Sequence, residues 1–431
     1  MVAKRSAAAV QPTTDDEPAA SGTIMDATRL AAVCDKIDEY FERGAAPVNR
    51  RQVEAVCAMI DGRAVSRKDR RMRRRNCVDS TRRYEQASQI GSGTFGVVAK
   101  ASHRGTGRTV AVKTFRALDA GERPSDVGDV LREACFLAAC RGHPNLVGFH
   151  GVARDPATGE YSLVMEYVGP SLRSALNDRL EKTGRAFTEA AVRGVMRQLL
   201  TGAEAMHGRR VIHCDIKPGN VLVGDGVVKI CDLGLAMSPA ESRPPYGSVG
   251  THRYMAPEVL TGVPEYDERV DTWSLGCVMA ELLSGEALFK PDYVGDDDVH
   301  RQLDRIFDVL GVPAVETWET FMPPPRMGGE VLRRQAAQPR PPCPRGRLRE
   351  LFPRETLSQD GFEVLKGLLA CNPKERLTAA AALRLPWFTT DTGDGTILGD
   401  VASPLVRVLN NVWALVRQIA LPLIVSCPGV A

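Results

Sequence analysis

The chain has 431 residues, of which 43% are hydrophobic and 25% are charged, and its 56 basic and 53 acidic side chains give a net charge of +3. These proportions exclude a wholly disordered chain, a collagen-like fibre and a disulfide-stapled miniprotein, and the length predicts roughly two or three compact units. The eleven cysteines are scattered without a CxxC pair. We therefore expect reduced thiols in the nucleus or cytoplasm, and neither a disulfide framework nor a zinc site.

The N-terminal part of the chain differs in composition from the rest. Residues 1–22 are rich in Ala, Pro and Thr and lack an apolar core, so we predict disorder and no secretory signal. Residues 23–83 are predicted to form a helical hairpin followed by a basic linker, because apolar side chains recur at helical spacing. Between Arg67 and Arg75, seven of nine residues are Arg or Lys. Such a run is typical of a nuclear-import signal or a polyanion contact, and equally of a solvated linker, and both interpretations stay open.

From Tyr84 onward the pattern changes to short strands, one helix and then a helical region. The strands are predicted at 84–90, 97–102, 109–115, 146–154 and 161–167, with a helix at about 128–140. Beyond Pro170 the periodicity is mostly helical as far as Phe388. A small β-rich part followed by a large α-rich part predicts an α+β, bilobal fold, with lobes at 84–168 and 169–388 and a cleft between them.

The last segment, 389–431, becomes apolar toward its end. Arg407 and Arg417 interrupt the apolar stretch, and the final uncharged run, 418–431, is shorter than the roughly 20 residues that a membrane-spanning helix needs. We therefore predict a docking tail and no membrane partner, with a tail anchor as the second alternative.

A glycine-rich segment separates the first two predicted strands. It consists of Ile90, Gly91, Ser92, Gly93, Thr94, Phe95 and Gly96. In a dinucleotide-binding fold such a segment leads into a helix, whereas here a second β-type run follows it. Because glycine lacks a side chain, the backbone of the resulting hairpin can close over phosphate groups. The pattern predicts a phosphate-binding hairpin.

A single lysine lies in the next apolar strand. Burying Lys113 without a partner would be costly, whereas phosphates and a carboxylate would compensate its charge. Glu133 in the predicted helix is the carboxylate that we assign, although Arg132 and Glu122 are also nearby in the sequence. The alternative is that Lys113 extends to solvent.

The most specific motifs lie in the middle of the chain. Residues 213–220 are His-Cys-Asp-Ile-Lys-Pro-Gly-Asn, residues 232–234 are Asp-Leu-Gly and residues 256–258 are Ala-Pro-Glu. In this order, after the glycine segment and Lys113, they resemble the motifs of eukaryotic protein kinases. The resemblance covers residues 84–388 and implies the kinase fold, with ATP and Mg²⁺ as cofactors and a protein as substrate.

The resemblance also implies roles for single residues. Asp215 would orient or accept the hydroxyl proton of the substrate, and Lys217 would neutralise the moving phosphoryl group. Lys113, paired with Glu133, would contact the α- and β-phosphates. The remaining implied positions are Asn220 and Asp232 as Mg²⁺ ligands, Met165 as gatekeeper, Glu166 and Val168 in the hinge, and Val98, Ala111 and Leu222 around adenine. Taken singly, Asp and Asn in loops are more often turn formers or caps.

Further stretches resemble one group of kinases. Lys217 and the Gly250-Thr251 pair are similar to serine/threonine kinases, and residues 302–311 and 273–277 resemble cyclin-dependent kinases, with the plant F-type set as the nearest likeness. A cyclin or another regulatory protein is therefore a candidate partner. Nucleic acid is not expected as a partner, because no reader motif accompanies the basic run. The Glu258–Arg376 pair and Asp271 are similar to contacts that hold the large lobe together.

Three features depart from the pattern of this group. Cys214 replaces the arginine that binds a phosphate on the activation loop, and Tyr246 stands where the phosphorylated threonine is usual. Met255 replaces an arginine that selects proline after the phosphoacceptor, and extra residues within 126–130 lengthen the approach to Glu133. We therefore do not carry over loop phosphorylation, proline preference or cyclin binding from the group.

The resulting hypothesis is a serine/threonine protein kinase that uses Mg-ATP and is active without activation-loop phosphorylation. The alternative is a catalytically weak or inactive kinase-fold scaffold that binds ATP and partner proteins. Cys214 and the segments outside the resemblance motivate this alternative.

Overall fold

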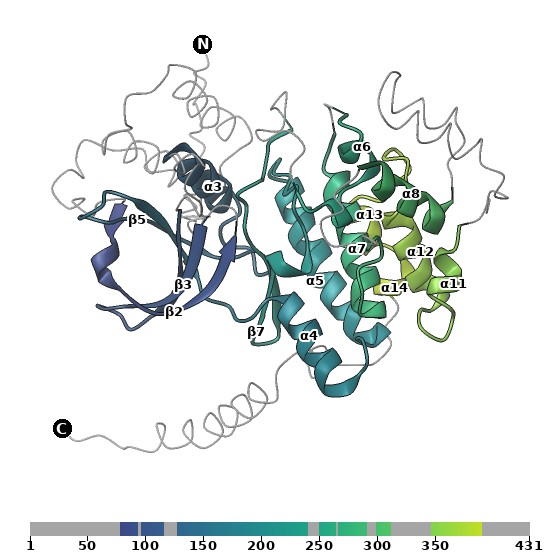
Figure 1. Ribbon diagram of the computed structural model, residues 1–431, viewed down its shortest axis with the longest axis horizontal. Helices are drawn as coiled ribbons and strands as arrows, with labels where there is room; N and C mark the ends of the chain where they lie inside the picture. Colours follow the sequence, from purple (N-terminus) through teal and green to yellow (C-terminus); the bar gives the residue numbers. More distant parts are fainter. Residues whose placement is uncertain are drawn as a thin grey trace, which may run out of the picture.

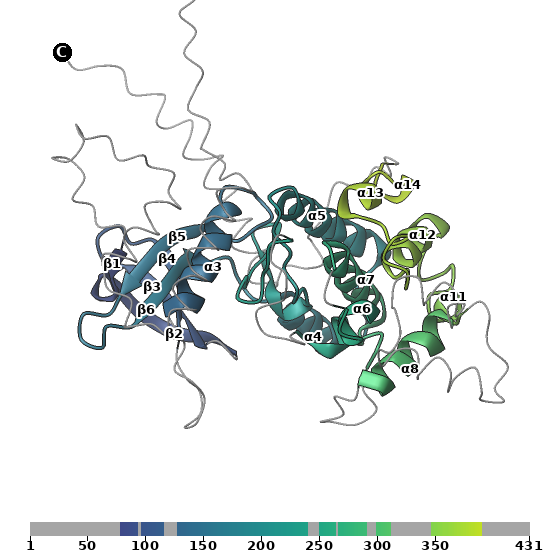
Figure 2. The ribbon, with the colours of Figure 1, turned by 90° about the horizontal axis from the view of Figure 1, so that it is seen from above.

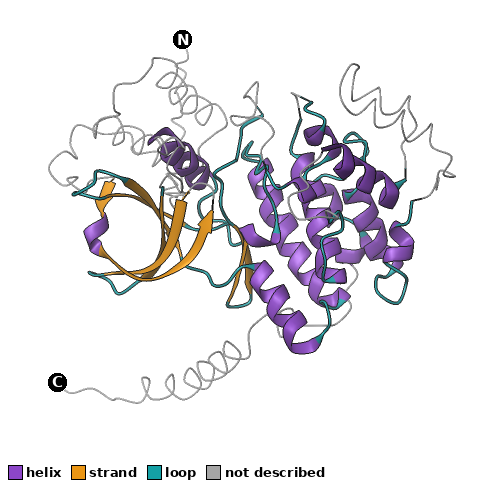
Figure 3. Ribbon diagram, in the orientation of Figure 1, coloured by secondary structure: helices purple, strands orange, loops and turns teal. Residues whose placement is uncertain are grey.

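The computed structural model describes residues 78–93, 96–115, 127–239, 250–263, 266–290, 299–311 and 346–389. They form a β-rich lobe and a helical lobe (Figure 1), and Figure 3 shows how sharply strands and helices separate. The predicted α+β bilobal fold is confirmed. The predicted N-terminal hairpin, the basic run and the C-terminal tail lie outside the described residues. Within the described ranges, no helix has the length and apolar character needed to cross a membrane.

The small lobe is a six-stranded sheet with one helix against it. Its elements are β1 (Val78–Ser80), η2 (Thr81–Arg83), β2 (Tyr84–Gly93), β3 (Gly96–His103), β4 (Thr109–Thr114), α3 (Val127–Ala139), β5 (Phe149–Arg154) and β6 (Tyr161–Glu166). The strand order is β1-β5-β6-β4-β3-β2, and α3 lies against β5 and β6 (Figure 2). Cys135, Phe136 and Leu137 of α3 are fully buried, so this part of α3 is enclosed on most sides.

The edge strand β1 was not predicted from the sequence. It pairs parallel to β5, with Val78 opposite Val152, and the Val78 side chain is buried in the core. The Tyr84 hydroxyl donates to Asp79 Oδ2 at 3.0 Å, and the Thr81 hydroxyl donates to Asp155 Oδ2 at 3.1 Å. The sheet therefore begins before Tyr84, within residues 23–83, where we had predicted a basic linker after the helical hairpin.

Removing β1 and η2 is expected to destabilise the small lobe. Deletion of residues 1–83 exposes the edge of β5 and the apolar surface under Val78, at a cost of about 2 kcal/mol. Deletion of residues 1–77 is the matched control, because it keeps both elements. Thermal unfolding of the two shortened chains checks the prediction, and equal midpoints would contradict it.

The large lobe is helical around a central buried helix. Its elements are α4 (Leu172–Thr183), α5 (Glu189–His207), η3 (Pro218–Asn220), β7 (Val221–Gly224), β8 (Val227–Ile230), η4 (His252–Tyr254), α6 (Pro257–Leu260), α7 (Arg269–Ser284), α8 (Val299–Leu310), α11 (Leu348–Leu351), α12 (Gln359–Leu368), α13 (Ala379–Leu383) and α14 (Pro386–Thr389). Every residue of α7 from Val270 to Leu283 is buried. Helix α7 therefore lies at the centre of the lobe, with α5 and α12 packed against it (Figure 2).

A two-stranded hairpin, β7–β8, interrupts the helical region and was not predicted. Asp225 and Gly226 connect the strands with φ values of 47° and 79°. Left-handed backbone at both turn positions is typical of an Asp-Gly hairpin. The turn signal was present in the sequence, but the mostly helical periodicity around it masked it. The hairpin matters because Asn220 precedes β7 and Asp232 follows β8, so both lie at its open end, opposite the turn.

A buried ion pair connects α6 to the loop before α13. Arg376 Nη1 and Nη2 donate to Glu258 Oε1 and Oε2 at 2.6 and 2.9 Å, and both side chains are almost fully buried. The guanidinium also donates to the carbonyls of Ala370 and Arg269, and its Cζ lies 5.0 Å from the centre of the Trp273 ring. The pair therefore joins three parts of the large lobe, as its sequence resemblance implied.

Candidate active site

The glycine segment forms the turn between β2 and β3. Gly91 pairs with Val98 across the hairpin, and Gly93 pairs with Gly96. Gly96 has a φ of +135°, and a Cβ there would lie 2.1 Å from the Thr114 carbonyl oxygen, so this position requires glycine. The turn residues Thr94 and Phe95 lie outside the described residues.

Lys113 of β4 lies in a buried cluster of charges. Its Nζ donates to both carboxylate oxygens of Glu133 at 3.0 and 2.8 Å, and to Asp232 Oδ1 at 2.6 Å. The structure thus brings together residues from the sheet, from α3 and from the segment after β8. The alternative in which Lys113 extends to solvent is wrong, because its side chain is 6% exposed.

The electrostatics of this cluster favour the charged forms of Lys113 and Asp232, but not that of Glu133. Burial alone would lower the pKa of Lys113, but the carboxylates of Glu133 and Asp232 outweigh burial and raise it. Burial would likewise raise the pKa of Asp232, but Lys113 reverses the direction and lowers it. Burial raises the pKa of Glu133, and the two hydrogen bonds from the ammonium oppose that shift. The cluster presents an ammonium group that can also meet phosphate oxygens.

Three polar side chains surround the Asp215 carboxylate. Lys217 Nζ lies 2.7 Å from Asp215 Oδ2, and the Thr251 backbone and hydroxyl donate to Asp215 Oδ1 at 3.1 and 3.0 Å. Lys217 also donates to the Thr251 hydroxyl at 2.8 Å, and Asn220 Nδ2 donates to Asp215 Oδ2 at 3.0 Å. Both Asp215 oxygens are therefore oriented, and the carboxylate is held beside an ammonium group.

Asp271 of α7 holds the start of this loop in place. Its carboxylate accepts the backbone N–H of His213 and of Cys214 at 2.8 and 2.9 Å, and it contacts His207 Nε2 at 2.9 Å. Burial would raise the pKa of Asp271, but these hydrogen bonds and the nearby histidines lower it. Cys214 has a φ of 65°, a conformation that these contacts stabilise.

Asn220 and Asp232 provide oxygen atoms that fit a magnesium ion. The Asn220 amide nitrogen donates to the Asp215 carbonyl at 2.9 Å, so its amide oxygen is the atom available to a metal. The Asn220 carbonyl accepts the Cys231 N–H at 3.0 Å, which ties the catalytic loop to the residue before Asp232. A carboxylate and an amide oxygen are ligands that Mg²⁺ prefers.

The predicted adenine contacts surround the junction of the lobes. Met165 pairs with Ala111 in the sheet, Val98 lies in β3, and Leu222 lies in β7 below them. The hinge passes so close to β7 that a Cβ on Gly169 would lie 2.2 Å from the Val223 carbonyl oxygen. The Glu166 backbone N–H donates to the Gly148 carbonyl, so the Glu166 carbonyl is the group that can face a base.

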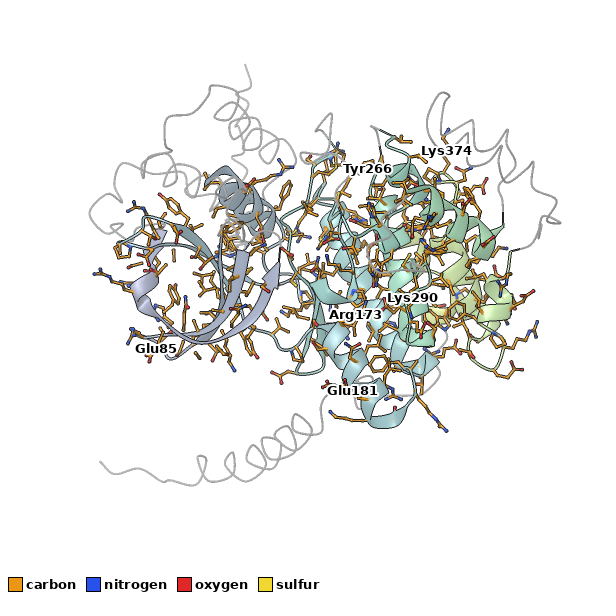
Figure 4. The ribbon with its side chains drawn as sticks, in the orientation of Figure 1. Glu85, Arg173, Glu181, Tyr266, Lys290 and Lys374 are labelled. Atoms are coloured by element: carbon orange, nitrogen blue, oxygen red, sulfur yellow. The ribbon has the colours of Figure 1, made fainter. Side chains whose placement is uncertain are left out.

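The loop after Thr251 is tied to the large lobe by a network that the sequence did not reveal. The Tyr254 hydroxyl donates to Glu281 Oε2 at 2.7 Å, and Arg173 Nη2 lies 2.6 Å from the same hydroxyl. Arg173, labelled in Figure 4 at the start of α4, also pairs with Glu281. Met255 is buried next to this network. Because these residues are far apart in the chain, no spacing rule could have grouped them.

Comparison with known proteins agrees with the fold. The protein kinase domain family matches residues 84–388. The chain belongs to the protein kinase family. Cys214 therefore lies within the part of the chain that matches this family.

Individual relatives show which kinases the chain is similar to. The chain is 48% identical over 315 residues to the "Putative cyclin-dependent kinase F-2" of Oryza sativa subsp. japonica, covering 71% of this chain and 90% of the relative. It is 38% identical to the cell division control protein 2 homolog 3 of Trypanosoma brucei brucei, covering 72% and 93%, and 34% identical to the cyclin-dependent kinase G-2 of Oryza sativa subsp. indica, covering 71% and 41%. The protein is a cyclin-dependent-kinase-like serine/threonine kinase.

Proposed function

We propose that the protein transfers the γ-phosphate of Mg-ATP to serine and threonine hydroxyls of proteins, and that its active site assembles without a phosphate on the activation segment. The supporting observation is that Lys113 contacts Glu133 and Asp232 while Lys217 and Thr251 orient Asp215. Both halves of the phosphoryl-transfer machinery are therefore aligned in the unmodified chain.

The chemistry follows from this placement. Asp215 orients the substrate hydroxyl and takes its proton as the hydroxyl oxygen bonds to the γ-phosphorus and ADP leaves. Lys217 offsets charge on the moving phosphoryl group, and Lys113 holds the α- and β-phosphates. Magnesium, when bound with ATP, would neutralise phosphate charge, and Asn220 and Asp232 would hold it.

Two features support independence from loop phosphorylation. A phosphate would have no guanidinium at position 214, where a cysteine stands. Instead, Arg132 Nη2 of α3 donates to the Ala236 carbonyl at 3.1 Å, two residues after the Asp-Leu-Gly motif. Arg132 thus contacts this segment directly, and Glu133 is linked to it through Lys113, which also contacts Asp232. None of these contacts needs a phosphate.

The cysteine pattern supports a reducing compartment. The cysteines of the whole chain are scattered without a CxxC pair, and three of the six in the described residues are buried. Burial raises the pKa of Cys140 to about 12, which keeps that thiol protonated and unreactive. We accordingly place the protein in the nucleus or the cytoplasm.

Substrate preference offers the sharpest test of this proposal. The unmodified chain is expected to phosphorylate a mixed Ser/Thr peptide library from Mg-ATP, with no requirement for proline after the acceptor, because Met255 offers no guanidinium. The Met255→Arg variant is expected to raise the proportion of proline-directed products. Nucleotide binding without any transfer would contradict the proposal and support the scaffold alternative.

A further inference from the structure

The junction behind the hinge contains an ion pair that none of the roles above uses. Lys229 of β8 places its Nζ 2.8 Å from Glu166 Oε1 and 3.0 Å from Oε2. Oε2 also accepts the Gly148 N–H at 2.9 Å. The side chains of Lys229 and Glu166 are 15% and 29% exposed, so water screens this pair less than a surface pair.

Three chain segments meet at this carboxylate. Glu166 ends β6 and begins the hinge, Gly148 lies in the loop that follows α3, and Lys229 lies three residues before Asp232. A Cβ on Gly148 would lie 2.6 Å from Oε2 of Glu166, so a larger residue there would displace the Glu166 carboxylate. The Glu166 backbone N–H also donates to the Gly148 carbonyl at 2.8 Å. The loop and the hinge are thus joined by backbone and side chain together.

The same loop is also joined to β8 by its backbone. The Val147 N–H donates to the Ile230 carbonyl, and the Ile230 N–H donates to the Asn145 carbonyl, each at 2.9 Å. Asn145 Nδ2 donates to the Val228 carbonyl at 3.0 Å and to Gln198 Oε1 of α5 at 2.9 Å. A continuous set of contacts therefore runs from the loop after α3, through β8, to the large lobe.

We propose that Glu166 and Lys229 are positioning residues that fix the orientation of the hinge relative to α3 and β8, and thereby preorganise the nucleotide site. Glu133 is carried by α3, Asp232 follows β8, and the hinge faces adenine. Glu166 lies at the start of the hinge, and its side chain contacts the loop after α3 and strand β8. Without these contacts, the hinge has to become ordered when the nucleotide binds, and the affinity for the nucleotide falls. Peptide binding is unaffected, because Asp215, Thr251 and Tyr254 are held by other contacts.

The test compares Lys229→Met and Gly148→Ala with the unchanged chain. The first variant removes the ammonium and keeps the aliphatic stem, and the second keeps every charge but displaces the Glu166 carboxylate. Both are expected to raise the Kd for Mg-ADP about five- to tenfold while the KM for peptide stays within about twofold. Both are also expected to speed amide hydrogen exchange in residues 145–148 without nucleotide.

Arg197→Met is the matched control, because Arg197 donates to the Phe388 carbonyl at 2.7 Å in the large lobe, away from the hinge. It is expected to lower thermal stability and leave the Kd for Mg-ADP unchanged. An unchanged Kd in Lys229→Met, or tighter binding, would overturn the positioning role. The inference rests on the proposed use of ATP, so failure of the unchanged chain to bind Mg-ADP would contradict that function. Unchanged amide hydrogen exchange at residues 145–148 in the two variants would instead show that Glu166 and Lys229 do not hold this loop.

Discussion

Asp215→Asn is expected to lower the rate of phosphate transfer by about three to four orders of magnitude. The amide cannot take the proton of the substrate hydroxyl, and it loses the negative charge that holds Lys217 at 2.7 Å. Nucleotide contacts through Lys113 are expected to persist, because Lys113 pairs with Glu133 and Asp232 and not with Asp215. Single-turnover transfer to a peptide, measured beside the Kd for Mg-ADP, checks both halves of the prediction.

Thr251→Val provides a graded comparison for that experiment. It removes the hydroxyl that donates to Asp215 Oδ1 and accepts from Lys217, but it keeps the carboxylate and the backbone contact. Its transfer rate is expected to fall between those of the unchanged chain and Asp215→Asn. Transfer by Asp215→Asn at the unchanged rate would show that another group handles the hydroxyl proton.

Arg376→Met is expected to be the most destabilising single substitution considered for the fold. It leaves the Glu258 carboxylate buried without its partner, which costs about 3–5 kcal/mol. It also removes the donor to the Ala370 and Arg269 carbonyls. The midpoint of thermal unfolding is expected to fall by roughly 10 °C, as measured by calorimetry.

Two companion variants give this stability prediction its controls. Adding Glu258→Gln to Arg376→Met removes the stranded charge and is expected to recover part of the lost stability. Lys290→Met breaks an exposed pair with Glu286 and is expected to change stability by less than about 0.5 kcal/mol. A normal midpoint for Arg376→Met would show that the buried pair does not hold the lobe together.

Much of the small lobe followed from local pattern. The predicted strands and the helix around Glu133 agree with β2 to β6 and α3, since alternation and helical spacing report burial directly. A partner for Lys113 was expected because a charge in an apolar strand needs one, and the order of the motifs identified Glu133 as that partner. The roles of the motif residues came from resemblance to kinases, and their chemistry stays a prediction.

Other features depend on contacts between distant segments and left no local signal. Strand β1 has only three residues, and it pairs parallel to β5, so no hairpin turn between them could be recognised in the sequence. The same holds for Tyr254, Arg173 and Glu281, which meet only after the large lobe has folded. A hydrogen bond between distant segments leaves no periodic pattern in either segment, so a single sequence does not reveal these pairs.

We propose that the phosphoryl-transfer site is assembled in the unmodified chain. This can be measured as transfer from Mg-ATP to a Ser/Thr peptide by purified protein that has been treated with a phosphatase and carries no partner protein. The expected result is transfer that Asp215→Asn abolishes. Transfer that begins only after phosphorylation of the chain, or only with an added regulatory protein, would show that the unmodified chain does not assemble the site.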